Sequence, residues 1–322
     1  MEVVLTGTGA IVVTGAAGFV GRALVDRLRA AGRAVRPVVR EERGEVDGAI
    51  ALGPLERASA EALARVLGGA SAVVHLAARA HVMDERGADA EAAYRSANVD
   101  ATANLARAAT AARVPRFVLA SSVKVNGEAT APGRPFRPDD PPAPQDAYGR
   151  SKRDAEAALA EACRESSTAA IVLRLPLVVG PGARGNVARL VDAIAAGRTL
   201  PFGAIDNRRS VLGLANLCDA IVAALDAQPA PAGVHFVADA QPVSTPELVR
   251  AIAKALGRPV PLAFVPPALL RFAGRLAGKG AEIGRLTGSL EVDASSFAAA
   301  TGWRPAHTLD EELGRLARAR SL

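Results

Sequence analysis

Short β-branched apolar runs alternate with longer helical patterns through the first half of the chain, and this alternation is the strongest constraint on the fold. The runs expected to be strands are AIVVTG, AVRPVVR, SAVVHLAA, RFVLASS and AAIVLRL. Ala-rich segments with helical periodicity separate them. Strands that alternate with helices form βαβ units, so we predict an α/β fold with a doubly wound, parallel Rossmann sheet. Such a sheet binds its ligand at the carboxyl ends of its strands.

The pattern loosens after LRLPLVVGPG and indicates a smaller C-terminal α+β domain. Helices are expected at about 185–196 and 214–227. Two more helix starts fit the capping box, in which a hydroxyl residue precedes Glu by three positions. These are the segments 244–247 and 308–311.

Two features of the chain bear on its domain organisation. We expect a Rossmann domain at residues 1–176 plus about 211–238, and a smaller substrate domain at residues 177–210 and 239–322. The segment 126–146 is too rich in Pro and Gly to form the interior of a helix or strand. A loop of that length within a compact domain is more often functional than idle.

Composition and charge exclude several classes of function. The net charge is +6, but no run rich in Lys and Arg is interleaved with aromatic residues, so we expect no nucleic-acid binding. Cys163 and Cys218 lie far apart and the four histidines are scattered, so we predict neither a disulfide framework nor a metal site. The chain has no secretory leader and no apolar stretch approaching about 18 residues, which predicts a cytoplasmic protein without membrane insertion.

The segment 268–285, LLRFAGRLAGKGAEIGRL, is basic and amphipathic. We expect it to form a helix packed on the smaller domain. A role at a membrane surface is the alternative, because basic amphipathic helices also lie in the plane of lipid headgroups.

Two glycine-rich turns follow each other near the start of the chain, and only one has the context of a phosphate-binding loop. Gly15, Gly18 and Gly21 come after a predicted strand and lead into an amphipathic helix. In this arrangement the first glycine permits a tight turn, the second lets a pyrophosphate approach the backbone, and the third allows close helix packing. The helix N-terminus adds free N–H groups and a positive dipole end. Gly7 and Gly9 run into a second strand instead, so we interpret residues 1–9 as an upstream extension.

The end of the second predicted strand bears on the choice of dinucleotide. A Rossmann site usually carries an acidic residue there, which binds the ribose 2′-hydroxyl. This chain has Val39 followed by Arg40, and the bidentate guanidinium of arginine suits a 2′-phosphate. We therefore favour NADP(H) over NAD(H). The alternative is that Glu41 or Glu42 binds the ribose and Arg40 is a surface residue.

The most specific signal for chemistry is Tyr148-Gly-Arg-Ser-Lys152, which opens a helical stretch. A spacing of four places the phenol and the ammonium on one helix face. A free phenol has a pKa of about 10, so it is a poor base at neutral pH. A neighbouring ammonium and the positive ring of a nicotinamide would favour the phenolate. Ser121 and Ser122 end the preceding strand, where a hydroxyl could hold a substrate oxygen.

With these motifs the chain resembles the extended short-chain dehydrogenases/reductases, and within them the NAD-dependent epimerase/dehydratase family that acts on nucleotide sugars. The resemblance covers nearly the whole chain. The matching segments are T-G-A-A-G-F-V-G (14–21), H-L-A-A (75–78), N-V-D-A-T-A-N-L (98–105), L-A-S-S-V-K-V-N-G (119–127), Y-G-R-S-K (148–152), L-R-L-P-L-V-V-G-P-G (173–182) and R-S-V-L-G-L-A-N-L (209–217).

The resemblance implies roles for individual residues. Tyr148 is the general acid/base at the sugar C4 oxygen, Ser122 is the hydroxyl beside it, and Lys152 lowers the pKa of Tyr148 while holding the nicotinamide ribose. Cofactor contacts are implied for Gly15, Ala17, Gly18, Phe19, Val20, Gly21, Arg40, Leu76, Ala77, Ala78, Asn98, Tyr148, Lys152 and Pro176. Contacts with a UDP-sugar substrate are implied for Ser122, Lys124, Asn186 and Arg209.

Several of these assignments carry an alternative. Asn98 matches an asparagine that supports the active-site helix, although it could simply be a satisfied polar residue. Arg208 could replace Arg209 as the anion clamp. Ser121 is interpreted as the structural neighbour of the catalytic serine. The resemblance also implies a homodimer.

Departures from the family pattern narrow the activity. The 4,6-dehydratases of the family carry Asp-Glu after the active-site hydroxyl residue, whereas this chain has Val123 and Lys124, which argues against 4,6-dehydration. Asn126 replaces the usual Tyr, Gly53 is followed by Pro, and Leu177 stands where epimerases often have Asn. These changes weaken a plain UDP-glucose 4-epimerase assignment.

Three hypotheses follow. The favoured one is a reductase of a UDP-4-keto sugar, in which Tyr148 gives the proton. The second is a UDP-hexose or UDP-N-acetylhexosamine 4-epimerase that keeps NAD bound through the cycle. The third is a non-catalytic dinucleotide-sensing binder, which is disfavoured because both Tyr148 and Lys152 are present.

Overall fold

A seven-stranded parallel sheet forms the centre of the molecule in the computed structural model, which describes residues 9–42, 44–80, 88–278 and 280–320. The strand order is β3-β2-β1-β4-β5-β6-β9, and every neighbouring pair is parallel. The strands are β1 (Ala10–Thr14), β2 (Val35–Val39), β3 (Ile50–Ala51), β4 (Ala70–His75), β5 (Arg116–Ser122), β6 (Ala169–Leu175) and β9 (Gly233–Phe236). From β1 the chain first adds strands on one side of the sheet, β2 and β3, and then continues with β4 on the other side of β1. Sheets of this kind bind ligands at this switch point between β1 and β4.

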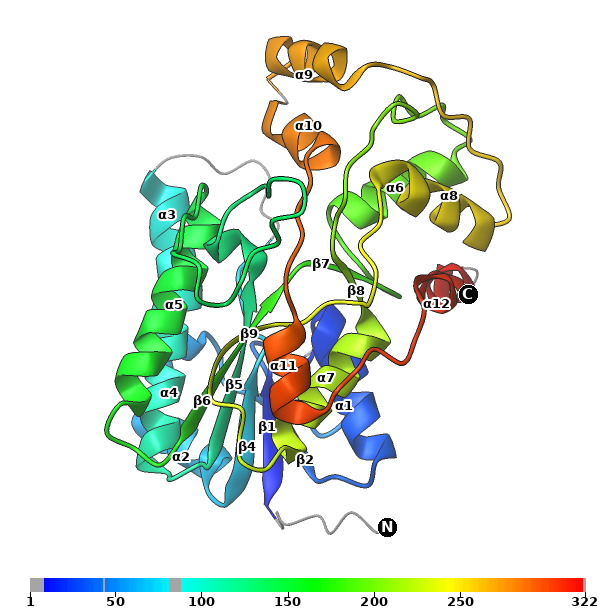
Figure 1. Ribbon diagram of the computed structural model, residues 1–322. Coiled ribbons are helices and arrows are strands. Elements are labelled where there is room, and N and C mark those ends of the chain that lie inside the picture. The colour runs from blue at the N-terminus through cyan, green and yellow to red at the C-terminus, as the bar shows by residue number, and fades with distance from the viewer. Residues whose placement is uncertain (1–8, 43, 81–87, 279, 321–322) are drawn as a thin grey trace.

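Helices cover both faces of the sheet, as the strand–helix alternation predicts (Figure 1). One face is covered by α1 (Phe19–Ala30), α7 (Leu214–Asp226) and α11 (Ser295–Thr301). The other is covered by α2 (Ala60–Leu67), α4 (Ala101–Ala111) and α5 (Ala147–Cys163). Because both faces are buried, the strands consist of continuous apolar runs without polar alternation. The predicted Rossmann fold is confirmed.

The first half also contains short elements around these layers. They are the 3₁₀ turns η1 (Leu55–Arg57) and η3 (Val123–Val125), the helix α3 (Ala88–Tyr94) and the π-helical segment η2 (Arg95–Asp100). The five predicted strands are all present, but β3 and β9 were not predicted. With two and four residues, they are too short to give a periodic signal.

A second apolar core lies beyond the carboxyl ends of the central strands. It is built from a two-stranded parallel sheet and five helices. These elements are β7 (Leu177–Val179), β8 (Val211–Gly213), α6 (Asn186–Ala195), α8 (Thr245–Ala255), α9 (Pro267–Leu276), α10 (Gly280–Thr287) and α12 (Leu309–Arg320). The helices expected at 185–196 and 214–227 correspond to α6 and α7, and both capping boxes are confirmed by reciprocal hydrogen bonds. The expected boundary separated 177–210 from 211–238, yet β7 and β8 pair directly across it.

The long loop at 126–146 bridges the two halves of the molecule by backbone hydrogen bonds. Its only described β-bridge joins Phe136 to Val292, in the segment that leads from α10 to α11. Backbone bonds from Thr130 to Ser289 and from Phe136 to Glu291 strengthen this junction. The loop therefore ties the Rossmann half to the smaller half beside the start of α5.

The segment 268–285 differs from the prediction of one helix. It forms two helices, α9 and α10, because Gly278 adopts a left-handed conformation (φ +68°) that ends α9. Within the described ranges, no helix is long and apolar enough to cross a membrane. The expected upstream extension at residues 1–9 lies outside the described residues except for Gly9.

Candidate active site

The glycine-rich turn after β1 has the geometry of a dinucleotide-binding loop. Gly15 has a φ of +69°, which only glycine adopts without strain. A Cβ at Gly21 would lie 2.1 Å from the Gly15 carbonyl oxygen, so the first turn of α1 can pack on the loop only with glycine there. Helix α1 begins after Gly18 with no side-chain cap and no acidic residue in its first turn. Its N-terminus therefore offers backbone donors and a positive dipole end to an anion.

The chain after β4 lies against this loop. A Cβ at Gly15 would be 2.6 Å from the Ala77 nitrogen, and the Leu76 nitrogen donates to the Thr14 carbonyl at 3.2 Å. These contacts place the segment Leu76–Ala78 beside the glycine turn, as its assignment to the cofactor site requires. Phe19 lies at the other side of the loop, where a Cβ at Gly182 would be 3.6 Å from its ring.

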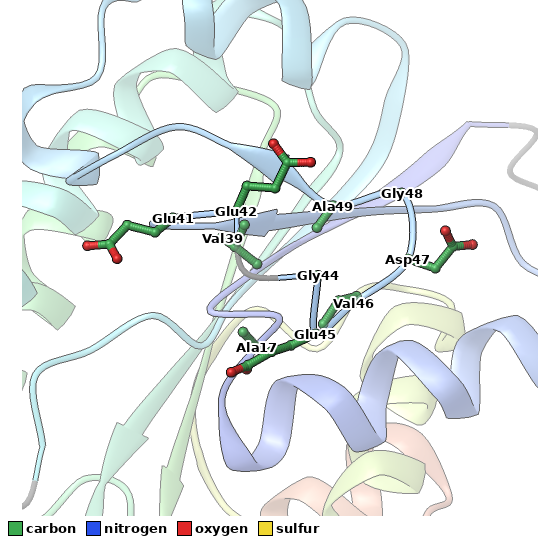
Figure 2. A pocket seen from close by; sticks show the side chains of 10 residues that line it. All are labelled: Ala17, Val39, Glu41, Glu42, Gly44, Glu45, Val46, Asp47, Gly48 and Ala49. Carbon is green, nitrogen blue, oxygen red and sulfur yellow. The ribbon is translucent and has the colours of Figure 1, made fainter.

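A pocket of about 300 Å³ opens next to this loop, at the carboxyl end of β2. Ala17 and Val39 line it together with four acidic residues, which are Glu41, Glu42, Glu45 and Asp47. Figure 2 shows Glu45 reaching beside Ala17, while Glu41 and Asp47 extend toward opposite sides. The glycine turn and the start of α1 would hold the pyrophosphate of a dinucleotide, and the adjoining pocket would receive its adenosine ribose.

Arg40 is not among the residues that line the pocket. It is exposed, and its carbonyl accepts a bond from the nitrogen of Gly53. Carboxylates accept hydrogen bonds from ribose hydroxyls and disfavour a 2′-phosphate, and one of the four, Glu45, is paired with Arg22 at 3.3 Å. The expectation of NADP(H), which rested on Arg40, finds no support in this lining.

Tyr148 and Ser122 meet at the carboxyl end of β5. Asp146 caps α5 by accepting a bond from the Gly149 nitrogen at 2.7 Å, and this cap places Tyr148 in the first turn. Burial of the hydroxyl raises the pKa of Tyr148 to about 12, and a hydrogen bond with Ser122 opposes that rise. The sequence predicted a lowered pKa. That expectation included the positive ring of a bound nicotinamide, whereas in the chain alone burial dominates and the pKa of Tyr148 is raised.

Lys152 lies one turn further along α5 and is only 4% exposed. Its Nζ donates to the Ala120 carbonyl on β5 at 2.7 Å. Burial lowers the pKa of Lys152 to about 8, and the nearby Glu156 carboxylate opposes this. Lys152 is thus held at the carboxyl end of the sheet, next to the strand that carries Ser122.

A buried ion pair between β6 and α5 fixes the helix that carries Tyr148 and Lys152. Arg174 on β6 bonds to Glu156 on α5 with an Nη2–Oε2 distance of 2.7 Å, and both side chains are nearly inaccessible. Glu156 also accepts a bond from the Ser121 hydroxyl, and Arg174 donates to the Asn126 side chain at 3.0 Å. Ser121 therefore acts as the structural neighbour that the sequence suggested, because its hydroxyl bonds to Glu156 and not to Tyr148.

Asn98 supports the same helix from the other side. It lies in the π-helical segment η2, and its Nδ2 donates to the Ser151 hydroxyl at 2.9 Å and to the Arg79 carbonyl at 3.1 Å. Its Oδ1 accepts from the Arg79 nitrogen at 2.7 Å. These bonds use its amide group within the protein, which matches the supporting role and not a direct cofactor contact.

Lys124 lies over the Tyr148 ring, with its Nζ 5.9 Å from the ring centroid. It pairs with Asp146 and, at 3.0 Å, with Glu128. Sequence reasoning singled out Lys124 but missed the two carboxylates that hold it. Asp146 could have been found as the capping residue two positions before Tyr148.

The smaller half contributes Arg209 but not Asn186 to this cluster. Arg209 Nη1 donates to the carbonyls of Arg285 at 2.6 Å and Gly288 at 2.8 Å. Burial lowers the pKa of Arg209, and the charge of Glu128 opposes this, which places Arg209 within electrostatic reach of the Lys124 cluster. Asn186 opens α6, and its Oδ1 accepts from Arg189 at 2.8 Å. No described contact joins Asn186 to Tyr148 or Lys124.

For three further residues named in the sequence analysis, the structure shows only where they lie and what they contact. Pro176 is buried between β6 and β7, and Val20, in the first turn of α1, packs on the core. Arg208, the alternative anion clamp, pairs with Glu291 at 3.1 Å on the surface. Within the described part of the chain, no group of His, Cys, Asp and Glu has the geometry to hold a metal ion.

Comparisons with known proteins agree with this geometry. Residues 11–238 match the NAD dependent epimerase/dehydratase family. The chain belongs to the NAD-dependent epimerase/dehydratase family. It is therefore an NAD-dependent enzyme of the short-chain dehydrogenase/reductase type, and its relatives include enzymes of nucleotide sugars.

Individual relatives of this family member span nearly its full length. It is 40% identical over 312 residues to a UDP-glucose 4-epimerase of Vibrio cholerae, covering 96% of this chain and 94% of that protein. It is 29% identical to the dTDP-6-deoxy-L-talose 4-dehydrogenase (NAD(P)(+)) of Kitasatospora kifunensis, covering 98% and 97%. The solved structure of MoeE5 in complex with UDP-glucuronic acid and NAD has a TM-score of 0.78 and 28% identity, covering 98% of this chain and all of that one.

Proposed function

We propose that the protein is an NAD(P)-dependent oxidoreductase that acts at C4 of a UDP-sugar. The arrangement of Ser122, Tyr148 and Lys152 at the carboxyl end of β5 carries this proposal, because it aims one phenol and one hydroxyl at a single substrate oxygen. The names of the relatives, which include enzymes of C4 epimerisation and C4 oxidation, support the same carbon. A dinucleotide-sensing binder would need none of these three side chains.

Each side chain has a distinct task in this reaction. Tyr148 gives its proton to the C4 oxygen or takes it back, and Ser122 holds that oxygen by a hydrogen bond. Lys152, whose Nζ donates to the Ala120 carbonyl, would hold the ribose of the bound cofactor. The bound nicotinamide supplies or accepts the hydride at C4.

We favour reduction of a UDP-4-keto sugar as the physiological direction. The protonated phenol of Tyr148 can give the proton that reduction of a ketone consumes. Val123 and Lys124, in place of an acidic pair, argue against a dehydratase. The second candidate is 4-epimerisation with tightly held NAD, which the 40% identical relative favours by name.

We infer that NAD(H) is preferred over NADP(H). Four carboxylates line the pocket at the end of β2, and a phosphate of about two negative charges is unfavourable there. The MoeE5 complex contains NAD, which supports the same choice. Fluorescence titration should give tighter binding of NADH than of NADPH, and Arg40→Ala should change neither. Tighter binding of NADPH that is lost in Arg40→Ala would restore the original expectation.

The remaining assignments follow from the same proposal. The cofactor belongs to residues 1–176 with 211–238, and the UDP-sugar to residues 177–210 and 239–322, where Asn186 and Arg209 would contact the diphosphate. A homodimer is expected from the family resemblance.

One assay separates the two directions. The protein is incubated with NADH or NADPH and a panel of UDP-sugars and UDP-4-keto sugars, while cofactor absorbance and sugar NMR spectra are recorded. Stoichiometric oxidation of the cofactor with formation of a 4-hydroxy sugar identifies the reductase. Interconversion of two UDP-sugars without net cofactor change identifies the epimerase. Absence of both reactions across the panel contradicts the proposed function.

A further inference from the structure

The exposed apolar side chains of the molecule are concentrated in one place. Among the described residues, the large hydrophobic side chains that are exposed all lie between positions 264 and 276. They are Phe264, Leu269, Phe272 and Leu276, with exposed fractions of 83%, 55%, 59% and 76%. Scattered apolar residues on a surface need no explanation, but a cluster of this kind marks an interaction site.

Helix α9 exposes Leu269, Phe272 and Leu276 on one face and packs against α10 with its opposite face. Leu269, Phe272 and Leu276 follow the spacing i, i+3, i+7, which keeps them within one side of a helix that turns about 100° per residue. Leu270 and Gly274 lie on the opposite side and are buried. A Cβ at Gly274 would be 2.7 Å from Ile283, so α9 and α10 touch closely there. The outward face is thus an apolar surface that the fold does not cover.

Two arginines flank this outward face. Arg271 and Arg275 are exposed and stand one turn apart between the apolar face and the buried face. The ten residues of α9 include no acidic side chain, and neither arginine forms an ion pair with any part of the chain that the structure describes. Other arginines near the surface form ion pairs, for example Arg150 with Glu91 and Arg320 with Asp192. Here apolar surface and uncompensated positive charge occur together.

The position of α9 leaves this face accessible. Figure 1 shows α9 at the outer end of the smaller half, with α10 between it and the central sheet. The end of α10 is fixed to the smaller half, because the Leu286 carbonyl accepts bonds from Asn207 and Thr245, and the Arg285 carbonyl accepts from Arg209. The helix pair is therefore a supported projection whose tip carries the apolar face.

We propose that the outward face of α9 docks on the surface of an anionic phospholipid bilayer. Leu269, Phe272 and Leu276 enter the boundary between headgroups and acyl chains, while Arg271 and Arg275 extend to lipid phosphates. A helix of ten residues is too short to span a bilayer, so it lies in the plane of the interface. This inference concerns where the enzyme works and does not depend on the direction of the reaction.

The charge favours a membrane over a second copy of the chain. A twofold contact through this face would bring the arginine pair of one copy near that of the other, with no acidic residue of α9 to compensate. The face also consists of only a few side chains, whereas a stable dimer buries roughly 1,200–2,000 Å² in total. An anionic bilayer satisfies both the apolar side chains and the arginines.

Vesicle co-sedimentation of the full-length protein tests the proposal. We expect binding to phosphatidylglycerol vesicles at low salt, about tenfold weaker binding to phosphatidylcholine vesicles, and a loss of binding as salt increases. Phe272→Ser combined with Leu276→Ser should reduce binding to phosphatidylglycerol about tenfold or more. Arg271→Gln combined with Arg275→Gln should reduce it about tenfold and abolish the preference for the anionic lipid.

A matched control uses two other exposed arginines of the smaller half, Arg198→Gln with Arg258→Gln, which remove the same charge elsewhere. Binding by this control should equal that of the wild type. NADH binding and circular dichroism verify that each variant is folded. The proposal is overturned if the wild type does not sediment with anionic vesicles, or if the control loses as much binding as Arg271→Gln/Arg275→Gln. It is also overturned if Phe272→Ser/Leu276→Ser turns a dimer into a monomer on gel filtration while vesicle binding is unchanged.

Discussion

The two sides of the candidate site differ in what their polar groups bond to within the protein. On the β5–α5 side, Tyr148 meets Ser122, and Lys152 is fixed to the Ala120 carbonyl. On the side of the smaller half, Arg209 is bonded to carbonyls of its own chain and Asn186 to its neighbour Arg189.

This difference separates chemistry from recognition. The fold alone assembles the proposed acid–base group, Tyr148 with Ser122, so it needs no substrate to be in place. Contacts with a diphosphate from the smaller half would compete with existing internal hydrogen bonds, and their net contribution is therefore small. Changes on the first side should alter the rate or the stability, whereas changes on the second should alter mainly the apparent affinity.

Replacing Tyr148 by Phe should have the largest effect. The variant keeps the ring but lacks the acid, and general acid–base catalysis contributes about 10²–10⁴-fold to the rate. We expect kcat to fall by about that factor while the Kd for NADH stays within about twofold, because Lys152 still contacts Ala120. Steady-state kinetics and fluorescence titration measure the two quantities. Full activity in this variant would remove Tyr148 from the mechanism.

The second largest effect is expected from breaking the buried Glu156–Arg174 ion pair, which should lower the free energy of unfolding. Glu156→Gln leaves the Arg174 guanidinium buried without its counter-charge, which typically costs about 3–5 kcal/mol of unfolding free energy. The double variant Glu156→Leu/Arg174→Met removes both charges and should recover most of that loss. Urea unfolding followed by circular dichroism provides the comparison. Equal destabilisation of the single and double variants would show that the charges do not act as a pair.

The pH dependence of the reaction should report Lys152. Its pKa is lowered to about 8, so the ammonium is lost as pH rises through 8, and kcat/KM should fall there. For stability the sign is opposite, since an unfolded lysine near 10.5 keeps its proton longer than the folded one. Between about pH 8 and 10.5 this residue therefore makes the folded state more stable as pH rises. An alkaline limb of kcat/KM that begins only above pH 10 would contradict the lowered pKa.

A smaller effect is expected on the recognition side. Arg209→Ala should raise the KM for the UDP-sugar about tenfold, equivalent to about 1.4 kcal/mol, with little change in kcat. Arg208→Ala is the matched control, because Arg208 is the adjacent residue and pairs with Glu291 on the surface. Equal KM values for both variants would mean that Arg209 serves only to hold the end of α10.

Local patterns predicted most of the catalytic side and little of its support. Tyr148 and Lys152 are four residues apart on one helix, so their shared face follows from spacing alone. Glu156 and Arg174 are on different elements, and no local pattern brings a helix residue and a strand residue together. The raised pKa of Tyr148 likewise depends on burial, which sequence spacing does not reveal.

The smaller half was less predictable for a related reason. Its capping boxes are local signals and were found, but the pairing of β7 with β8 joins segments more than thirty residues apart. The break between α9 and α10 depends on the left-handed conformation of Gly278. The family motif singled out Arg209, but its bonds to the end of α10 depend on how α10 is placed in the fold.

Isotope transfer tests most directly whether hydride is exchanged at C4 of a UDP-sugar with Tyr148 as the proton donor. The protein is incubated with UDP-4-keto sugars and NADH deuterated at C4 of the nicotinamide, and the product is examined by proton NMR. We expect deuterium at C4 of the sugar with the wild type and none above background with Tyr148→Phe. Deuterium at another sugar carbon, or equal transfer by Tyr148→Phe, would contradict it.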